Sequence, residues 1–239
     1  MKRSFLICAL FLGACVSQPV LSRGQTTSPI GTWQVDILGS EKGILMMTFS
    51  NNFTVTGYGI ARKQSGFITL AGTWHFDDKG DVLAGYVQTT NGVGMAAFSL
   101  TAHMLSPGRF RGKATSSSSR GYRCKGEQPL GFPPLSGSWN AVIKRKGKTL
   151  HEEFTATASS NYPAVFDITG QGLSDTTSFT LSGTIIVSAE NKVNASIDRT
   201  FGTDVQQSSL SGVFKPTRSK MLLDGDDDTG AHLSETATR

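Results

Sequence analysis

Apolar and polar residues alternate along much of the chain with the period of two that is typical of β-strands. Residues 53–60, 68–77 and 179–187 follow this pattern. One face of each segment is apolar and the other is mostly polar, as in an antiparallel sheet with one face in water. Turn-forming residues separate the runs at 50–52, 77–80, 106–108 and 190–192. No stretch has a helical period, so the pattern predicts an all-β protein.

The chain also contains an internal duplication, in which matching segments lie 106–113 residues apart. The matched pairs, in order, are 31–34 with 137–140, 53–59 with 166–172, 68–73 with 179–184, and 99–100 with 209–210. Because the order is kept, we expect two tandem homologous units, over residues 30–115 and 135–231. Each reads as an antiparallel meander of about seven strands.

A meander of this kind hides its two open edges if it closes into a barrel, so we expect closed or partly closed barrels. Gly31-Thr-Trp33, repeated as Gly137-Ser-Trp139, resembles the Gly-x-Trp that opens the first strand of lipocalins and avidins. The resemblance implies a calycin-like architecture in which each Trp is buried at one end of a barrel. It implies no ligand, because the second lipocalin signature and the ligand residues of avidin are missing. The alternatives are a β-sandwich in each half, or one large barrel shared by both halves.

The N-terminus has the features of an export signal. Lys2 and Arg3 precede an apolar run over residues 5–12 that is too short to span a bilayer. Leu12-Gly-Ala-Cys15 resembles the bacterial lipobox, which implies that residues 1–14 are removed and that Cys15 is lipidated. The protein would then be a membrane-anchored, outer-membrane lipoprotein of the cell envelope. Ordinary cleavage nearby, giving a periplasmic or secreted protein, is the alternative.

Three segments lie outside the two units. Residues 15–29 are polar and predict a tether, residues 116–134 predict a basic linker rich in Ser, Gly and Pro, and residues 232–239 predict a tail. Cys124 lies in the predicted linker and has no partner for an intrachain disulfide once Cys8 and Cys15 are removed or modified.

Charge is scarce and unevenly distributed. Charged residues make up 17% of the chain, against about 25% in an average domain. Between positions 109 and 148 the chain nevertheless carries ten basic residues and one acid, Glu127. The candidates for polyanion binding are Arg109, Arg111 and Lys113 on one strand face, and Lys144, Arg145, Lys146 and Lys148 at a hairpin tip. Such a surface would attract an anionic envelope component. Solvated strand faces are the alternative, and nucleic acid is not expected because no aromatic residues are interleaved.

One group of acids has the spacing of metal ligands. Asp224, Asp226, Asp228 and Glu235 stand at positions 1, 3, 5 and 12 of a twelve-residue loop, as in the calcium loop of an EF-hand. Thr229 replaces the turn Gly, and no flanking helices are predicted. Calcium is therefore the one candidate cofactor, and an acidic tail after the last strand is the alternative.

Signatures of hydrolases and metalloenzymes are missing. His151-Glu152 lacks the second His of a zinc protease, and no Gly-x-Ser-x-Gly elbow occurs. We therefore expect a non-catalytic envelope lipoprotein that acts as a binding or structural module, for a small apolar ligand or an anionic envelope partner. The alternatives are a small β-barrel enzyme of the isomerase or cyclase type and an outer-membrane-spanning β-barrel. A polar pocket with convergent titratable groups would favour the enzyme.

Overall fold

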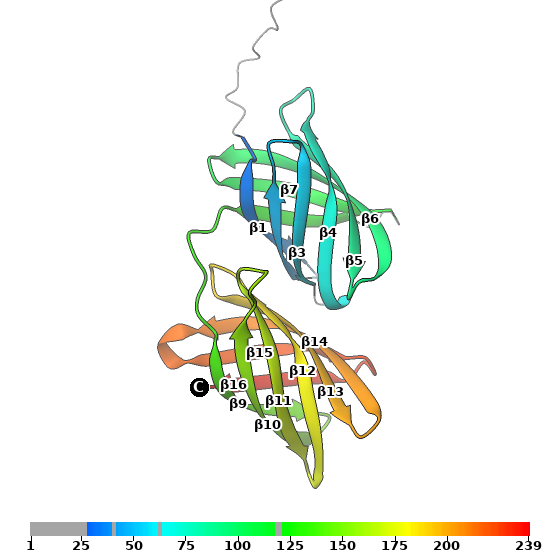
Figure 1. Ribbon diagram of the computed structural model, residues 1–239, viewed down its shortest axis with the longest axis vertical. Coiled ribbons are helices and arrows are strands. Elements are labelled where there is room, and N and C mark those ends of the chain that lie inside the picture. Colours follow the sequence, from blue (N-terminus) through cyan, green and yellow to red (C-terminus); the bar gives the residue numbers. More distant parts are fainter. Residues whose placement is uncertain (1–27, 40–41, 62–63, 118–120) are drawn as a thin grey trace, which may run out of the picture.

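The computed structural model describes residues 28–39, 42–61, 64–117 and 121–239, which form two closed antiparallel barrels in tandem (Figure 1). Each strand pairs with the next along the chain, and the last strand of each barrel pairs with the first. The predicted all-β class and the duplicated meander are confirmed. Of the three architectures left open by the sequence, the structure has the two separate barrels.

The first barrel is closed by pairing of β1 with β8. Its strands are β1 Gly31–Leu38, β2 Gly43–Phe49, β3 Thr54–Ala61, β4 Gln64–Phe76, β5 Val82–Thr90, β6 Val93–Ser106, β7 Arg109–Ser116 and β8 Gly121–Glu127. The second barrel is closed by pairing of β16 with β9. Its strands are β9 Gly137–Arg145, β10 Lys148–Ala158, β11 Val165–Ser174, β12 Thr177–Val187, β13 Lys192–Phe201, β14 Asp204–Lys215, β15 Lys220–Asp227 and β16 His232–Thr238, with a 3-10 turn at Pro216–Arg218.

Each barrel has eight strands, one more than predicted, and the additional strand lies outside the predicted unit. Strand β8 occupies part of the predicted linker, and β16 occupies the predicted tail. The inward positions of β8 include Cys124 and Gly126, which are too small to give an apolar pattern. Strand β16 turns Glu235 into the core, where the pattern requires an apolar residue. Both strands are therefore hidden from an analysis based on alternation.

The two repeated Trp residues occupy equivalent buried positions, as expected. Trp33 is 0% exposed and Trp139 is 1% exposed. The indole N–H of Trp33 donates to the carbonyl of Pro29 at 2.6 Å, and that of Trp139 donates to the carbonyl of Leu135 at 2.9 Å. In both barrels the ring thus fills the interior while its polar atom bonds the chain four residues upstream, which satisfies the buried donor.

The repeated glycines allow neighbouring strands to approach closely. A Cβ atom on Gly57 would lie 2.3 Å from the carbonyl oxygen of Met46, and one on Gly170 would lie 2.1 Å from that of Glu153. Both distances are far below van der Waals contact, so a side chain at either position would push two strands apart. The duplication has kept Gly where both barrels need it.

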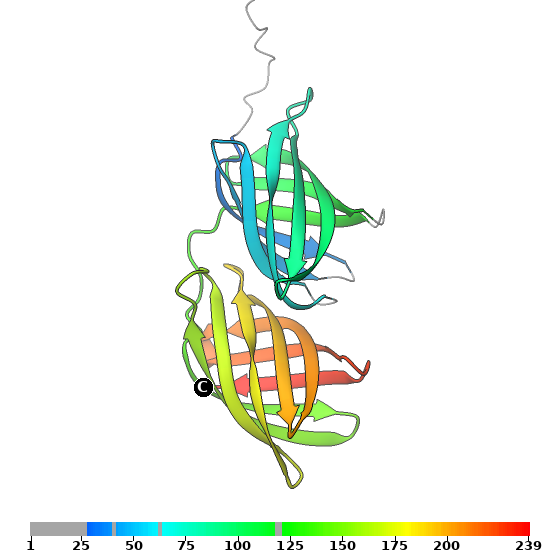
Figure 2. The ribbon, with the colours of Figure 1, turned by 45° about the vertical axis from the view of Figure 1, so that its right-hand side comes forward.

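The two barrels pack against each other through their outer faces (Figures 1 and 2). The contacts join β2, β3 and β4 of the first barrel to β12, β13 and β14 of the second. Ile44, Met46 and Ile60 point outward from the first barrel but are buried, in one apolar cluster with the core of the second. Beside them, the Tyr58 hydroxyl donates to the carbonyl of Pro163 at 2.9 Å. The apolar residues that interrupt the polar face of the first meander therefore form an interface.

Ion pairs border this interface on the β1 side. Asp36 is 3% exposed and pairs with Lys192 of the second barrel, and with Lys125 of its own barrel at 3.6 Å. Lys125 also reaches Glu190 across the interface at 2.9 Å. Hydrogen bonds from Lys192 and then Lys125 lower the pKa of Glu190 to about 2. A further hydrogen bond runs from the amide of Ala189 to the side-chain oxygen of Gln34 at 2.7 Å. These directional contacts fix the orientation of one barrel on the other.

Candidate functional site

The interior of the first barrel is filled by its own side chains. Its described residues leave a cavity of about 20 Å³, lined by Leu45, Gln88 and Phe98 among others. That volume suits about one water molecule, whereas pockets for small ligands measure roughly 300–1,000 Å³. The cavity that these residues line is therefore too small for the small apolar ligand that the sequence suggested.

The second barrel buries a layer of charged side chains at the level where the first barrel has its small cavity. The Arg199 guanidinium donates from Nε to Glu152 Oε1 at 2.5 Å, from Nη2 to Glu235 Oε2 at 3.1 Å, and from Nη1 to the Ser208 hydroxyl at 2.9 Å. All four residues are at most 2% exposed. We call Glu152, Arg199 and Glu235 the buried charge layer. The layer contains two carboxyl groups but only one cation. Among the described residues, Oε1 of Glu235 has no hydrogen-bond partner.

The fold does not require this layer. Strand registers place Leu45, Gln88 and Cys124 of the first barrel at the positions of Glu152, Arg199 and Glu235. The first barrel thus closes with an almost apolar layer there. Burial raises the pKa of the Cys124 thiol to about 12, so this Cys is unreactive at neutral pH.

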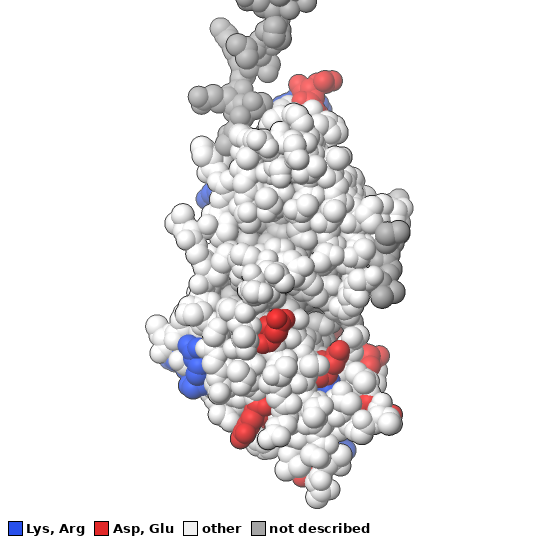
Figure 3. All heavy atoms as spheres, viewed as in Figure 1, with Lys and Arg blue, Asp and Glu red and all other residues white. Residues whose placement is uncertain are grey.

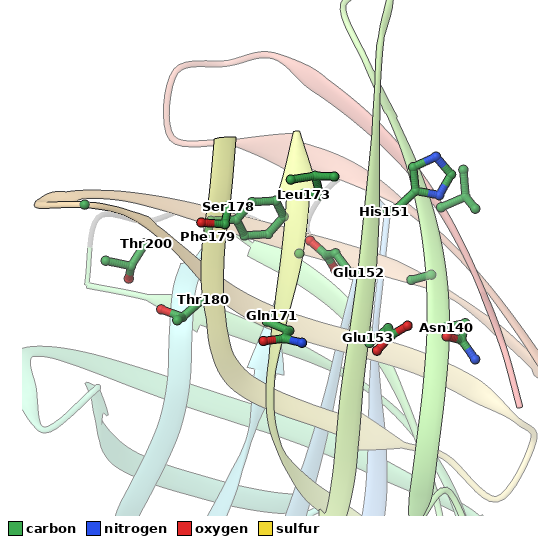
Figure 4. A pocket seen from close by; sticks show the side chains of 14 residues that line it. Asn140, His151, Glu152, Glu153, Gln171, Leu173, Ser178, Phe179, Thr180 and Thr200 are labelled. Carbon is green, nitrogen blue, oxygen red and sulfur yellow. The ribbon is translucent and has the colours of Figure 1, made fainter. Parts of the chain in front are cut away.

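A groove of about 790 Å³ lies on the outside of the second barrel, where it is formed by β9 to β13 (Figure 4). One row of polar side chains crosses it, with each residue paired to the next across neighbouring strands. The row is Asn140, Glu153, Gln171, Thr180 and Thr200. Neighbouring strands lie about 4.8 Å apart, so the five strands of the row span about 19 Å. We call these five residues the polar row.

A second row runs beside the first and is more apolar. It consists of Val142, His151, Leu173 and Ser178, again paired from strand to strand. Val142 is 39% exposed and Leu173 is 48% exposed, so both present apolar surface to the groove. Among the residues that the structure describes, no side chain of the polar row is hydrogen-bonded to another side chain. The groove therefore combines open hydrogen-bonding groups with an apolar border.

The same face of the first barrel has a different use. Gln34, Met46 and Tyr58 stand where the polar row has Asn140, Glu153 and Gln171, and Ile44 and Ile60 stand where the second row has His151 and Leu173. On the first barrel, this face is covered by the second barrel. In the second barrel the face is open to solvent and polar, which makes it the candidate binding site of the molecule.

The groove is absent from the sequence predictions, because its residues come from five strands and meet only through their register. The duplication does contain a signal. At equivalent positions the first unit has Ile44 and Met46, whereas the second has His151 and Glu153. An apolar-to-polar change on one face of two otherwise similar units marks that face as serving two purposes.

The structure separates the basic residues that the sequence grouped together. Arg109, Arg111 and Lys113 lie exposed on one face of β7, as predicted from their spacing. The hairpin of Lys144 to Lys148 belongs to the second barrel, and its turn lies at the far end of β10 from the loop that contacts the first barrel. Arg145 Nε donates a hydrogen bond to Asp227 Oδ2 at 2.6 Å, and Lys148 Nζ lies 3.9 Å from Asp175 Oδ2. The two groups are on different barrels and do not form one continuous surface.

The four candidate calcium ligands also lie apart. Asp224 and Asp226 point outward from β15, where His232 contacts them at 2.9 and 3.4 Å. Asp228 lies in the following turn, whereas Glu235 points into the barrel and belongs to the buried charge layer. Because side chains alternate along a strand, Asp224 and Asp226 lie on the outer face of the sheet and Glu235 on the inner face. In an EF-hand loop, residues with this spacing converge on one calcium ion. Across the described ranges, no group of three or more His, Cys, Asp or Glu side chains is arranged to hold a metal ion.

The predicted lipidation residue, Cys15, lies outside the described residues. Within the part of the chain that the structure covers, no helix is both long enough and apolar enough to cross a membrane.

No family model matches the chain, and no curated protein matches it. Among solved structures, a redesigned β-barrel, mFAP1, bound to DFHBI is 19% identical over 44% of this chain and 94% of its own, with a TM-score of 0.39. The Burkholderia oklahomensis agglutinin is 10% identical over 87% of this chain and 94% of its own, with a TM-score of 0.23. The transferrin-binding protein B of Haemophilus parasuis is 8% identical over 82% and 65%, with a TM-score of 0.21. At these TM-scores the likeness is too slight to transfer a ligand or a function.

Proposed function

We propose that the protein is a non-catalytic binding module whose groove on the second barrel holds an uncharged glycan. The observation that carries the proposal is the polar row, an unbroken line of amide, carboxylate and hydroxyl side chains across five strands. Amides and hydroxyls both donate and accept hydrogen bonds, which matches the hydroxyl groups of a sugar. The apolar border at Val142 and Leu173 suits the C–H faces of a sugar ring.

The charges of the groove favour a neutral ligand. Its lining contains one carboxylate that faces outward, Glu153, and neither Lys nor Arg. An anionic ligand would therefore meet repulsion and no counter-charge. The extended shape of the row, about 19 Å across five strands, favours a short oligosaccharide over a single sugar.

Binding without hydrolysis follows from the direction of the acids. Glycoside hydrolysis generally uses two carboxyl groups on either side of the bond that is cut. Glu152 and Glu153 are adjacent in β10, but Glu152 points into the barrel and is bound by Arg199, while Glu153 is exposed. The groove lining thus offers a single carboxylate to a ligand.

A panel of immobilised neutral oligosaccharides, followed by calorimetric titration of the best binder, tests the proposal. Gln171→Ala removes the central amide of the polar row and should weaken binding about tenfold, the loss expected for one or two hydrogen bonds. Gln207→Ala is the matched control, because Gln207 lies on β14, outside the groove, and its removal should leave the affinity unchanged. If no neutral oligosaccharide binds, or if Gln171→Ala binds as tightly as the wild type, the proposal is wrong.

We also propose that the barrels are exported and held at a membrane through lipidated Cys15. The support comes from the sequence, where Leu12-Gly-Ala-Cys15 ends an apolar run behind Lys2 and Arg3. A binding module on such an anchor would hold a glycan of the envelope close to the membrane.

A further inference from the structure

We infer that the outer face of β7 and β8 is a docking surface for an anionic lipid bilayer. Four cations form a compact group on this face, which we call the cation square: Arg111 and Lys113 of β7, and Arg123 and Lys125 of β8. Arg111 pairs directly with Lys125 across the strands, and Lys113 pairs directly with Arg123. The hairpin of Lys144 to Lys148, expected to share this role, is on the other barrel.

The arrangement is unfavourable for the isolated protein. Like charges directly opposite each other on neighbouring strands repel and destabilise the pair. Lys125 is compensated, because Asp36 lies 3.6 Å and Glu190 lies 2.9 Å from its Nζ atom. Arg111, Lys113 and Arg123 are exposed and have no ion pair among the described residues. Three cations thus remain available to a negatively charged partner.

The concentration of cations is particular to this face. Of the described Lys and Arg residues of the first barrel, only Lys42 and Lys79 lie outside β7 and β8. The face of the first barrel seen in Figure 3, with β3, β4 and β5 in front, carries few charged side chains. Strands β3, β4 and β5 contain no Lys, Arg, Asp or Glu. Among the described residues, the basic side chains of this barrel are therefore concentrated on β7 and β8.

The position of the barrel in the chain favours a membrane over other polyanions. If Cys15 is lipidated, the thirteen residues from there to Ser28 reach at most about 45 Å, since an extended residue spans up to about 3.5 Å. The first barrel then stays close to the bilayer, and weak contacts are sufficient because the anchor supplies a high local concentration. This choice of partner rests on the proposed anchor, whereas the cation square does not.

Exposed cations near an anionic membrane each contribute about a fivefold gain in binding, and salt screens them over about 8 Å. Binding of the exported Cys15→Ser chain, which has no lipid, should be measured on vesicles of phosphatidylcholine mixed with phosphatidylglycerol and on vesicles of phosphatidylcholine alone. We expect binding to the anionic vesicles only. The triple variant Arg111→Gln, Lys113→Gln, Arg123→Gln should bind them about a hundredfold more weakly, and raised salt should reproduce the loss. Circular dichroism of the variant checks its folding, and Lys125 stays in place to preserve the interface.

The matched control is Lys144→Gln, Lys146→Gln, Lys148→Gln, which removes the same charge from the second barrel and should change vesicle binding less than about threefold. Equal losses in the two triple variants would mean that net charge alone governs binding, which overturns the inference. Equal binding of the wild type to neutral and anionic vesicles would also overturn it. Tighter binding to soluble heparin than to vesicles would assign the face to a soluble polyanion instead. Glycan binding through the second barrel and fatty-acid labelling of Cys15 are separate measurements, so failure of either proposal is distinguishable from failure of this one.

Discussion

The buried charge layer of the second barrel should make stability depend on pH in a way that one substitution removes. Arg199 supplies one positive charge between two carboxylates, Glu152 and Glu235. Burial, and then the charge of Glu152, raise the pKa of Glu235 from 4.5 to about 7, while Arg199 opposes the shift. A proton on Glu235 makes the layer neutral, which explains the direction of the shift.

The magnitude follows from the difference between the folded and unfolded chains. Between pH 4.5 and 7 the unfolded chain has lost the Glu235 proton and the folded chain has kept it. The free energy of unfolding therefore falls as pH rises through this window, by about 1.4 kcal/mol per pH unit and about 3 kcal/mol in all. This contribution is fully present below pH 4.5 and is lost above pH 7. Glu235→Gln keeps an acceptor for Arg199 without the titration, so it should be more stable than the wild type by up to about 3 kcal/mol at pH 8.

Urea unfolding followed by circular dichroism at several pH values from 4.5 to 8 measures the effect. The difference between wild type and Glu235→Gln isolates this group from the other titrating residues, and it should grow steadily across the window. Glu153→Gln is the control, because it makes the same substitution at an exposed position of β10, outside the buried charge layer. A difference that stays constant from pH 5 to 8, or a Glu235→Gln variant that is less stable at pH 8, would refute the reasoning.

Two further predictions concern the core and the anchor. Trp33→Ala and Trp139→Ala should each lower the free energy of unfolding, measured in urea, by about 3–5 kcal/mol, because each removes a fully buried ring. In the wild type, iodide should quench neither indole as it quenches free Trp, and quenching of either would contradict its burial. Cys15 should incorporate a fatty-acid analogue in cells and Cys15→Ser should not, whereas an unlabelled, soluble wild-type protein would exclude the anchor.

The fold was largely predictable because most strands bury one face and expose the other. Alternation over residues 68–76 and 179–187 matches β4 and β12, and the duplication predicted that one unit would resemble the other. The prediction failed for β8 and β16, whose inward positions hold Gly126 and Glu235. A charged residue in the core satisfies its charge through a partner far away in sequence, here Arg199, and the local pattern contains no sign of that partner.

The candidate sites were less predictable, because they depend on register. The spacing of Arg111 and Lys113 showed that both lie on one strand face, but only strand pairing shows that Arg123 and Lys125 stand opposite them. Residues that are close in sequence can also lie on opposite faces of the sheet. Asp224, for example, points outward, whereas Glu235 points inward. Sequence spacing predicts the side of a strand on which a residue lies. It does not predict which strands are neighbours or how they are aligned.

Because the two equivalent faces are used differently, the second barrel does not offer the apolar contact through which the first barrel binds its neighbour. The barrels join head to tail, so a longer array would grow by docking a third barrel on the face of the second that corresponds to Ile44 and Met46. That face carries His151 and Glu153, and a third unit would have to desolvate these polar groups without gaining an apolar contact. A few substitutions on one face thus distinguish the second unit from the first and leave it with a surface that no other part of the described chain covers.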